Sequence, residues 1–270
     1  MRPPWDKKES ISEILDLSQN VCIDSHLPVF TFDPLVYDDP YYSYKALSEY
    51  HNVSIDAIAI GLGLSELIVR ILTVIKHRGW SMMIADHPTW QPVTALQIAL
   101  KIPTGTDVLY VADPNGNNGQ RGSISGQYKL IIRDKSYADF TGDTSINLNE
   151  LTLKTFSKSL ALPGARFGWV IGPKDIIQEV QDIRPARVTI GGMCNNIKFM
   201  LSQIKPHVSR MNETKQYLES KYSCVSSLAN YVLFKNPPQW HKNVQMKKIN
   251  DLYRMSLVDM DTLHDKVIRN

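Results

Sequence analysis

The chain has 270 residues, of which 43% are hydrophobic and 21% are charged, as expected for a globular protein with one large core or two domains. The net charge of +3 comes without a dense Lys/Arg run, so we expect no nucleic-acid partner. Three widely spaced cysteines, Cys22, Cys194 and Cys224, speak against a disulfide framework or a structural zinc site. No signal-peptide-like stretch and no run of about 18 apolar residues occurs, so we predict a cytoplasmic protein without membrane contact.

The first half of the chain predicts helices that alternate with a buried strand. Helices are expected at 43–51, 65–76 and 91–100, and a strand at 81–85. Apolar residues recur at helical spacing from Leu67 to Ile75, and Ser65 is the expected N-cap. Residues 1–35 contain four prolines and little periodicity, which indicates an extended arm with a short helix at 11–17.

The second half continues this alternation. Strands are expected at 108–111, 129–133, 151–156, 167–171, 229–234 and 252–257, and helices at 174–182, 193–221 and 262–269. Short apolar strands between helices are typical of an α/β protein with a buried, mostly parallel sheet.

Polar side chains follow the ends of two predicted strands. Asp134 and Tyr137 come after one strand, and Ser157 and Lys158 come after the next. Ligands of open α/β sheets bind outside the carboxyl ends of the strands, so we expect a binding site here.

Lys158 is the first candidate for chemistry. An unpaired lysine at the end of a buried strand is costly, whereas partial burial lowers its pKa as imine formation requires. Arg166 follows eight residues later in the run Leu-Pro-Gly-Ala-Arg-Phe-Gly and suits a phosphate dianion. Thr155 and Ser157 add hydroxyl donors. Each residue taken alone also has a structural interpretation, such as an exposed lysine at a strand end.

Two further features lie upstream. The glycine-rich segment Gly-Leu-Gly-Leu-Ser opens the helix at 65–76, and a glycine-rich turn at a helix N-terminus binds anions. Trp90 follows the next strand and could stack on an aromatic ring, although a core tryptophan is equally compatible with this position.

Taken in order, these elements resemble the fold-type I aminotransferases that use pyridoxal 5′-phosphate (PLP), and among them the histidinol-phosphate aminotransferase-like group (class I/II), in a compact version. The resemblance runs from about Tyr37 to the C-terminus and is most specific in residues 155–168. It implies an N-terminal arm at 1–35, a three-layer α/β/α large domain with a mostly parallel sheet at 36–180, and a small α/β domain at 181–270.

The resemblance also implies PLP as the cofactor, no metal, and a role for each matching residue. Lys158 corresponds to the Schiff-base lysine and proton shuttle, Asp134 to the partner of the pyridine nitrogen, and Tyr137 to the donor to the phenolic oxygen. Trp90 corresponds to the residue that stacks on the ring, and Arg254 to the one that binds the substrate carboxylate. The expected phosphate contacts are Leu64, Ser65, Thr155, Ser157 and Arg166, together with Tyr37 from the neighbouring subunit, which implies a homodimer.

The chain departs from the family pattern in the loop 113–119. Its sequence Asp-Pro-Asn-Gly-Asn-Asn-Gly stands where the family has Pro-Asn-Asn-Pro-Thr-Gly, so Gly116 takes the place of the asparagine that bonds the phenolic oxygen. Either Asn115 or Asn117 takes over this role, or the contact is lost. Lys135 also stands where an acidic residue is usual, and connections near the substrate entrance are short.

We therefore expect an aminotransferase of amino-acid metabolism. It would move an amino group between an amino acid, or an amino-alcohol phosphate such as histidinol phosphate, and a 2-oxo acid. A PLP-dependent decarboxylase of a phosphorylated amino acid, of the threonine-phosphate type, uses the same residues and remains an alternative. A non-catalytic binding or regulatory protein is a third interpretation, against which the retained Lys158 and Asp134 argue.

Overall fold

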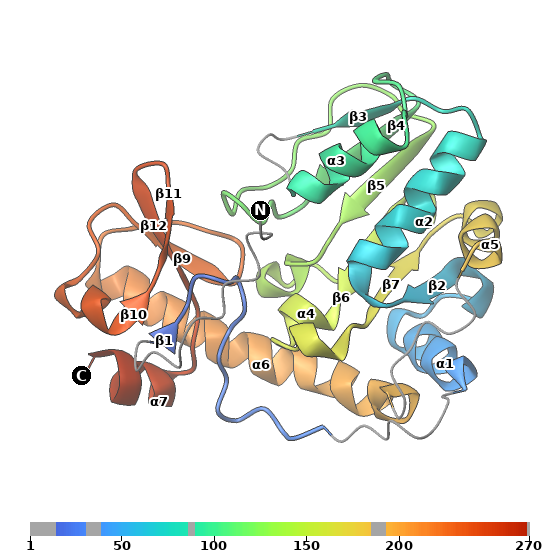
Figure 1. Ribbon diagram of the computed structural model, residues 1–270. Coiled ribbons are helices and arrows are strands. Elements are labelled where there is room, and N and C mark those ends of the chain that lie inside the picture. Colours follow the sequence, from blue (N-terminus) through green and yellow to red (C-terminus); the bar gives the residue numbers. More distant parts are fainter. Residues whose placement is uncertain (1–14, 31–38, 86–89, 185–192, 269–270) are drawn as a thin grey trace, which may run out of the picture.

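The computed structural model describes residues 15–30, 39–85, 90–184 and 193–268 (Figure 1). Two sheets lie side by side, and a long helix runs along both of them. Tyr37 and most of the predicted N-terminal arm lie outside the described residues. None of the helices in the described ranges is both long and apolar enough to span a membrane.

The larger sheet has six strands in the order β2-β7-β6-β5-β4-β3. They are β2 (Ile58–Gly61), β3 (Met82–Ile84), β4 (Val108–Ala112), β5 (Leu130–Asp134), β6 (Leu151–Thr155) and β7 (Gly168–Ile171). Neighbours from β3 to β6 run parallel, whereas β7 runs antiparallel to both β6 and β2. The predicted mostly parallel, buried sheet is confirmed.

Helices cover both faces of this sheet. They are α1 (Pro40–His51), α2 (Gly63–His77), α3 (Gln91–Ala99), α5 (Lys174–Asp182) and α6 (Met193–Lys221). Successive strand residues point to opposite faces: Ile58 and Ile60 pack in the cluster with α1 and α6, whereas Ala59 packs with α2 and α5. The result is the three-layer α/β/α arrangement that the sequence predicts.

The smaller sheet is antiparallel, in the order β11-β12-β9-β8. Its strands are β8 (Cys224–Val225), β9 (Tyr231–Phe234), β11 (Lys247–Ile249) and β12 (Leu252–Ser256). A short strand, β1 (Leu15–Asp16), pairs with β10 (Val244–Gln245) beside it. The chain closes with α7 (Met260–Thr262) and a π-helical turn at Leu263–Ile268. The three-part division of the chain stays a prediction.

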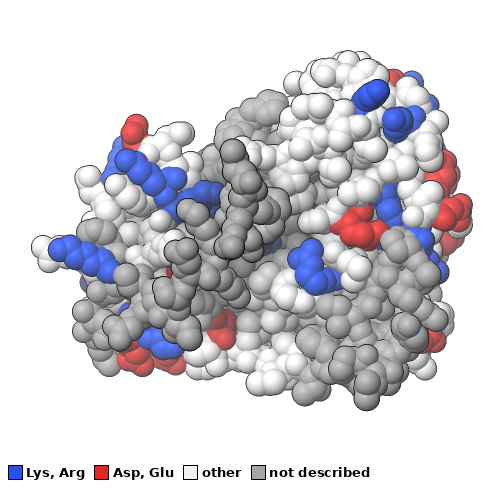
Figure 2. Space-filling view, viewed as in Figure 1, with Lys and Arg blue, Asp and Glu red and all other residues white. Residues whose placement is uncertain are grey.

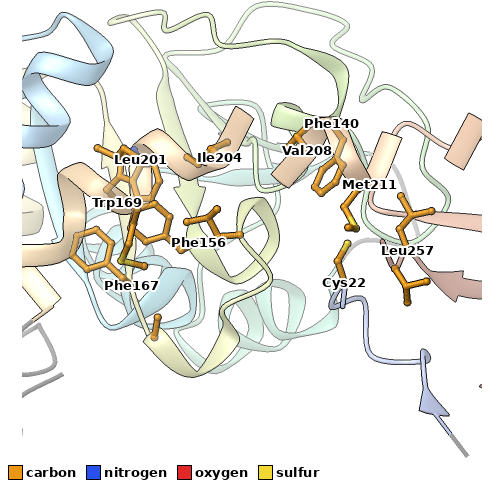
Figure 3. Packing of buried hydrophobic residues seen from close by; sticks show 14 of the residues in the cluster. Cys22, Phe140, Phe156, Phe167, Trp169, Leu201, Ile204, Val208, Met211 and Leu257 are labelled. Carbon is orange, nitrogen blue, oxygen red and sulfur yellow. The ribbon is translucent and has the colours of Figure 1, made fainter. Parts of the chain in front are cut away.

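An aromatic cluster lies between the large sheet and α6 (Figure 3). The ring centroids of Phe156, Phe167 and Trp169 are 5.0–6.1 Å apart, and Leu201 of α6 lies against them. Phe156 begins the single helical turn α4 (Phe156–Ser159) that carries Lys158, and Phe167 directly follows Arg166. The hydrophobic core therefore holds Phe156 and Phe167, which lie near the two ends of residues 155–168.

Two local predictions are wrong, and the short strands β2, β8, β10 and β11 are missed. The four residues of β2 are too few to show a clear period. Ser65 is not the N-cap of α2: the helix begins at Gly63, so Ser65 lies in its first turn. The helix expected at 11–17 is not formed by Leu15 and Asp16, which pair as a strand with β10.

Candidate active site

A pocket of about 420 Å³ lies where β4, β5 and β6 end, and the segment Ser18–Asn20 and the strands β11 and β12 contribute to its lining. Every predicted site residue within the described chain lines it: Leu64, Ser65, Trp90, Asn115, Asn117, Asp134, Tyr137, Thr155, Ser157, Lys158, Arg166 and Arg254. Tyr37 lies outside the described residues. Residues from six separate parts of the chain thus meet at the carboxyl edge of the sheet, where ligands of open α/β sheets bind.

Lys158 lies in the turn that follows β6. Its Nζ donates to the backbone carbonyl of Asn20 at 2.9 Å and lies 5.8 Å from the ring centre of Tyr137. Burial lowers the pKa of this amine to about 8, and the positive charge of Arg254 acts in the same direction, against the opposing influence of Asp134. With this pKa, roughly one tenth of the amine is neutral at pH 7, compared with well under 1% for an ordinary lysine.

Asp134 is the last residue of β5, and its carboxylate is fixed on both oxygens. Oδ1 accepts from the backbone N–H of Ser136 at 3.0 Å and from its hydroxyl at 2.5 Å. Oδ2 accepts from the hydroxyl of Tyr110 at 2.8 Å. Sequence reasoning missed Tyr110, because an aromatic residue in the middle of a buried strand looks like ordinary core.

The opposite side of the pocket begins at the N-terminus of α2. Gly63 has φ +75°, a backbone conformation that favours glycine, and a Cβ atom there would lie 2.7 Å from Nη2 of Arg166. The Arg166 guanidinium donates to the carbonyl of Pro163 at 3.1 Å and to that of Leu62 at 3.3 Å. Among the described residues no carboxylate pairs with Arg166. A cation beside the free amides of a helix N-terminus is suited to a phosphate group.

Arg254 comes from β12 and is only 4% exposed. Its Nη2 donates to the carbonyl of Ser18 at 3.0 Å, and its guanidinium lies 5.3 Å from the ring centre of Tyr231. Its Nε is buried and has no hydrogen-bond partner in the described part of the chain. Burial lowers the pKa of this group, and no carboxylate in the described residues pairs with it.

Comparison with known proteins agrees with this geometry. Residues 127–234 match the family model for aminotransferases of class I and II. The histidinol-phosphate aminotransferase of Lactococcus lactis subsp. cremoris (strain SK11) is 23% identical over 234 residues. The chain is thus similar to the class I and II aminotransferases over this part of its length. The alignment covers 72% of the chain and 66% of that protein, so the chain spans just under two thirds of its relative.

Solved structures of aminotransferases have the same fold. The histidinol-phosphate aminotransferase from Clostridium acetobutylicum superimposes with a TM-score of 0.70 at 16% identity, over 92% of the chain and 95% of that structure. The one from Sinorhizobium meliloti, in complex with pyridoxal-5′-phosphate, gives a TM-score of 0.64 at 16% identity, over 86% and 81%. Both likenesses show that the chain has the fold of these aminotransferases.

The charged side chains that line the pocket suit a phosphorylated ligand such as PLP. Among the described residues, the pocket lining contains four cationic side chains, Lys158, Arg166, Lys247 and Arg254, and a single carboxylate, Asp134. This excess suits a ligand that brings a phosphate and a substrate that brings a carboxylate. The outer surface differs from the pocket: on the described part of the face in Figure 2, basic and acidic residues are interspersed.

The departures from the family pattern have structural explanations. Lys135 is buried and donates to Asp143 and to Ser145, both at 2.9 Å, so it forms a local ion pair behind the pocket. Asn115 is buried, and its Oδ1 accepts from the backbone N–H of Asn117 at 2.9 Å, which shapes the loop. Trp90 lines the pocket but is 40% exposed.

Proposed function

We propose that this chain is a PLP-dependent aminotransferase in which Lys158 binds the cofactor covalently. The observation that carries the proposal is the meeting of four groups in one pocket: the Lys158 amine with its pKa of about 8, the fixed Asp134 carboxylate, the Tyr137 hydroxyl and the Arg166 guanidinium. Each suits one functional group of a phosphorylated hydroxypyridine aldehyde.

The residues have distinct tasks in this proposal. Bound PLP supplies an electron sink for the carbanion that forms when a substrate loses a proton. Asp134, held by Tyr110 and Ser136, stabilises positive charge at the pyridine nitrogen. Lys158, once free, accepts the proton from the substrate carbon and returns it, which an amine with a pKa near 8 does efficiently.

Arg254 gives the pocket its substrate preference. A buried guanidinium with an unpartnered Nε and no carboxylate partner in the described residues suits a substrate carboxylate, with which it can form two parallel hydrogen bonds. We propose an amino acid, or an amino-alcohol phosphate of the kind in the relatives' names, as amino donor, and a 2-oxo acid as acceptor.

Two further parts of the proposal concern the oligomeric state and the cellular location. We propose a cytoplasmic homodimer with shared sites, to which Tyr37 contributes across the interface. Tyr41 and Tyr42, close to Tyr37 in sequence, are 53% and 57% exposed, and such aromatic residues are enriched at protein interfaces. Light scattering coupled to size-exclusion chromatography should give twice the chain mass of 30.7 kDa.

The test of function starts with the visible absorbance spectrum after PLP is added. Wild type should develop a band that borohydride abolishes, Lys158→Ala should lack it, and Lys205→Ala, at an exposed site on α6, should keep it. Transfer of a labelled amino group from an amino acid to a 2-oxo acid should then follow. Release of carbon dioxide instead would favour the decarboxylase, and no band in wild type would contradict the proposal.

A further inference from the structure

The loop that departs from the family pattern has no room for the family's asparagine. A Cβ atom at Gly116 would lie 2.6 Å from Cε2 and 3.1 Å from Oη of Tyr137. A side chain at position 116 would therefore have to displace the Tyr137 ring, which is only 9% exposed. Glycine at this position is thus tied to the placement of Tyr137, and position 116 itself supplies no side-chain donor to the phenolic oxygen.

The side chain of Asn20 lies next to this position. Its Nδ2 donates to the carbonyl of Gly116 at 3.1 Å and to the hydroxyl of Tyr137 at 3.1 Å. A carbonyl oxygen can only accept, so the nitrogen of the amide must face Gly116, and the same nitrogen faces Tyr137. Tyr137 therefore accepts from Asn20, and its own proton stays available for another acceptor in the pocket.

Asn20 is held in this position by its backbone. Its carbonyl accepts from Nζ of Lys158 at 2.9 Å and from Nδ2 of Asn230 at 3.1 Å. Its φ of 56° is in the left-handed region, which asparagine tolerates better than most residues. The residue is 8% exposed, and its Oδ1 is buried without a hydrogen-bond partner in the described residues.

We propose that Asn20 is a positioning residue for Tyr137: its amide fixes the hydroxyl with the proton directed at the cofactor's phenolic oxygen and so offsets the donor lost at Gly116. A hydroxyl that accepts one hydrogen bond becomes a stronger donor in the next, because the two bonds polarise each other. The inference rests on the proposed function, since it concerns the same cofactor.

The experiment measures the pH titration of the visible band of the PLP-loaded protein. Hydrogen-bond donors to the phenolic oxygen disperse its negative charge. They therefore lower the pKa of the neighbouring lysine nitrogen, whose protonation the visible band reports. Asn20→Gly, which removes the amide without backbone strain, should raise the pKa of the band by about 0.5–1 unit. Asn20→Asp should raise it more, because a carboxylate accepts the Tyr137 proton instead.

A double-mutant cycle separates positioning from a structural role. In a Tyr137→Phe background, Asn20→Gly should cause no further shift of the pKa, because Asn20 acts through the hydroxyl that is already gone. Lys205→Ala, at an exposed site on α6 outside the pocket, should leave the titration as in wild type. Circular dichroism checks that each variant is folded.

The possible failures can be told apart. If wild type shows the band and both Asn20 variants titrate as wild type does, the inference is wrong and the proposed function stands. If Asn117→Ala shifts the pKa and the Asn20 variants do not, the loop supplies the contact instead. Additive shifts in the double mutant would also overturn positioning through Tyr137. Absence of a band in wild type would overturn the proposed function and this inference together.

Discussion

The hydroxyl of Tyr110 donates a hydrogen bond of 2.8 Å to Oδ2 of Asp134 across the neighbouring strands β4 and β5. Tyr110 is only 1% exposed, and burial together with the negative charge of Asp134 raises the pKa of its phenol well above the usual range. The phenol therefore stays a donor at every physiological pH, and the carboxylate has a permanent partner that sets its orientation.

Tyr110→Phe should weaken PLP binding while the protein stays folded. The substitution keeps the ring and removes one hydrogen bond to a charged group, which is worth about 1.5–3 kcal/mol, so we expect an increase in the Kd for PLP of roughly 10-fold or more. Fluorescence titration with PLP measures this constant. Tyr50→Phe, at an exposed residue, is the matched control, and equal affinities in the two variants would contradict the role of Tyr110.

Covalent binding of PLP should accelerate as the pH rises through about 8. Burial lowers the pKa of Lys158 from its usual value of 10.5 to about 8, so the neutral, nucleophilic amine accumulates from pH 7 to pH 9. Stopped-flow measurement of the visible band over this range gives the midpoint. A midpoint near 10.5, the value of an unperturbed lysine, would show that burial does not perturb this amine.

Gly63→Ala should reduce the affinity for PLP by at least about 10-fold. The new Cβ would lie 2.7 Å from Nη2 of Arg166 and would require a side chain at φ +75°, so both the guanidinium and the N-terminus of α2 must shift. Gly164→Ala is the control, because no atom lies within 4 Å of a Cβ at that position. The prediction fails if the two alanine variants bind PLP equally well.

Arg254→Gln should raise the KM for the amino donor by about 100-fold and leave PLP binding nearly unchanged. The guanidinium is the buried cation on β12 that is free to pair with a carboxylate, and such a pair is worth roughly 2–3 kcal/mol. Steady-state kinetics and PLP titration separate the two effects. Lys205→Gln, at an exposed site, serves as control, and an unchanged KM in Arg254→Gln would exclude this arginine from substrate binding.

Asp24→Asn should lower the free energy of unfolding by about 3 kcal/mol at pH 7. The fully buried Asp24 carboxylate pairs with His207 at 2.7 Å and with Arg210 at 2.6 Å, which ties the N-terminal segment to α6. Burial acts to raise the pKa of Asp24, but the hydrogen bonds from His207 and Arg210 outweigh it and lower the pKa below its usual value of 3.8.

The pH dependence follows from this lowered pKa. The stabilisation is fully present above the unfolded-state value near 3.8 and is lost as the pH falls below it towards the folded-state value. Urea unfolding of wild type and Asp24→Asn should therefore differ at pH 7 and converge in strong acid. Asp251→Asn, at an exposed carboxylate, should unfold like wild type at both pH values.

The sequence by itself determined the α/β class, most of the helices and strands, and twelve of the residues that line the pocket. Lys158 and Arg166 lie eight residues apart in one segment, and Asp134 ends a neighbouring strand, so short-range patterns were enough to find them. Parallel strands bring such residues to one edge of the sheet, which makes local position in the sequence a guide to the site.

Only the tertiary structure decided which side chains support these groups. Asn20 contacts Tyr137 across 117 residues and Lys158 across 138, and Tyr110 meets Asp134 from the neighbouring strand. No local pattern marks such contacts. They depend on where the segment that contains Asn20 lies in the fold and on the register of β4 against β5. An asparagine in an irregular segment and a tyrosine in a buried strand are ordinary in sequence, and packing alone makes them part of the site.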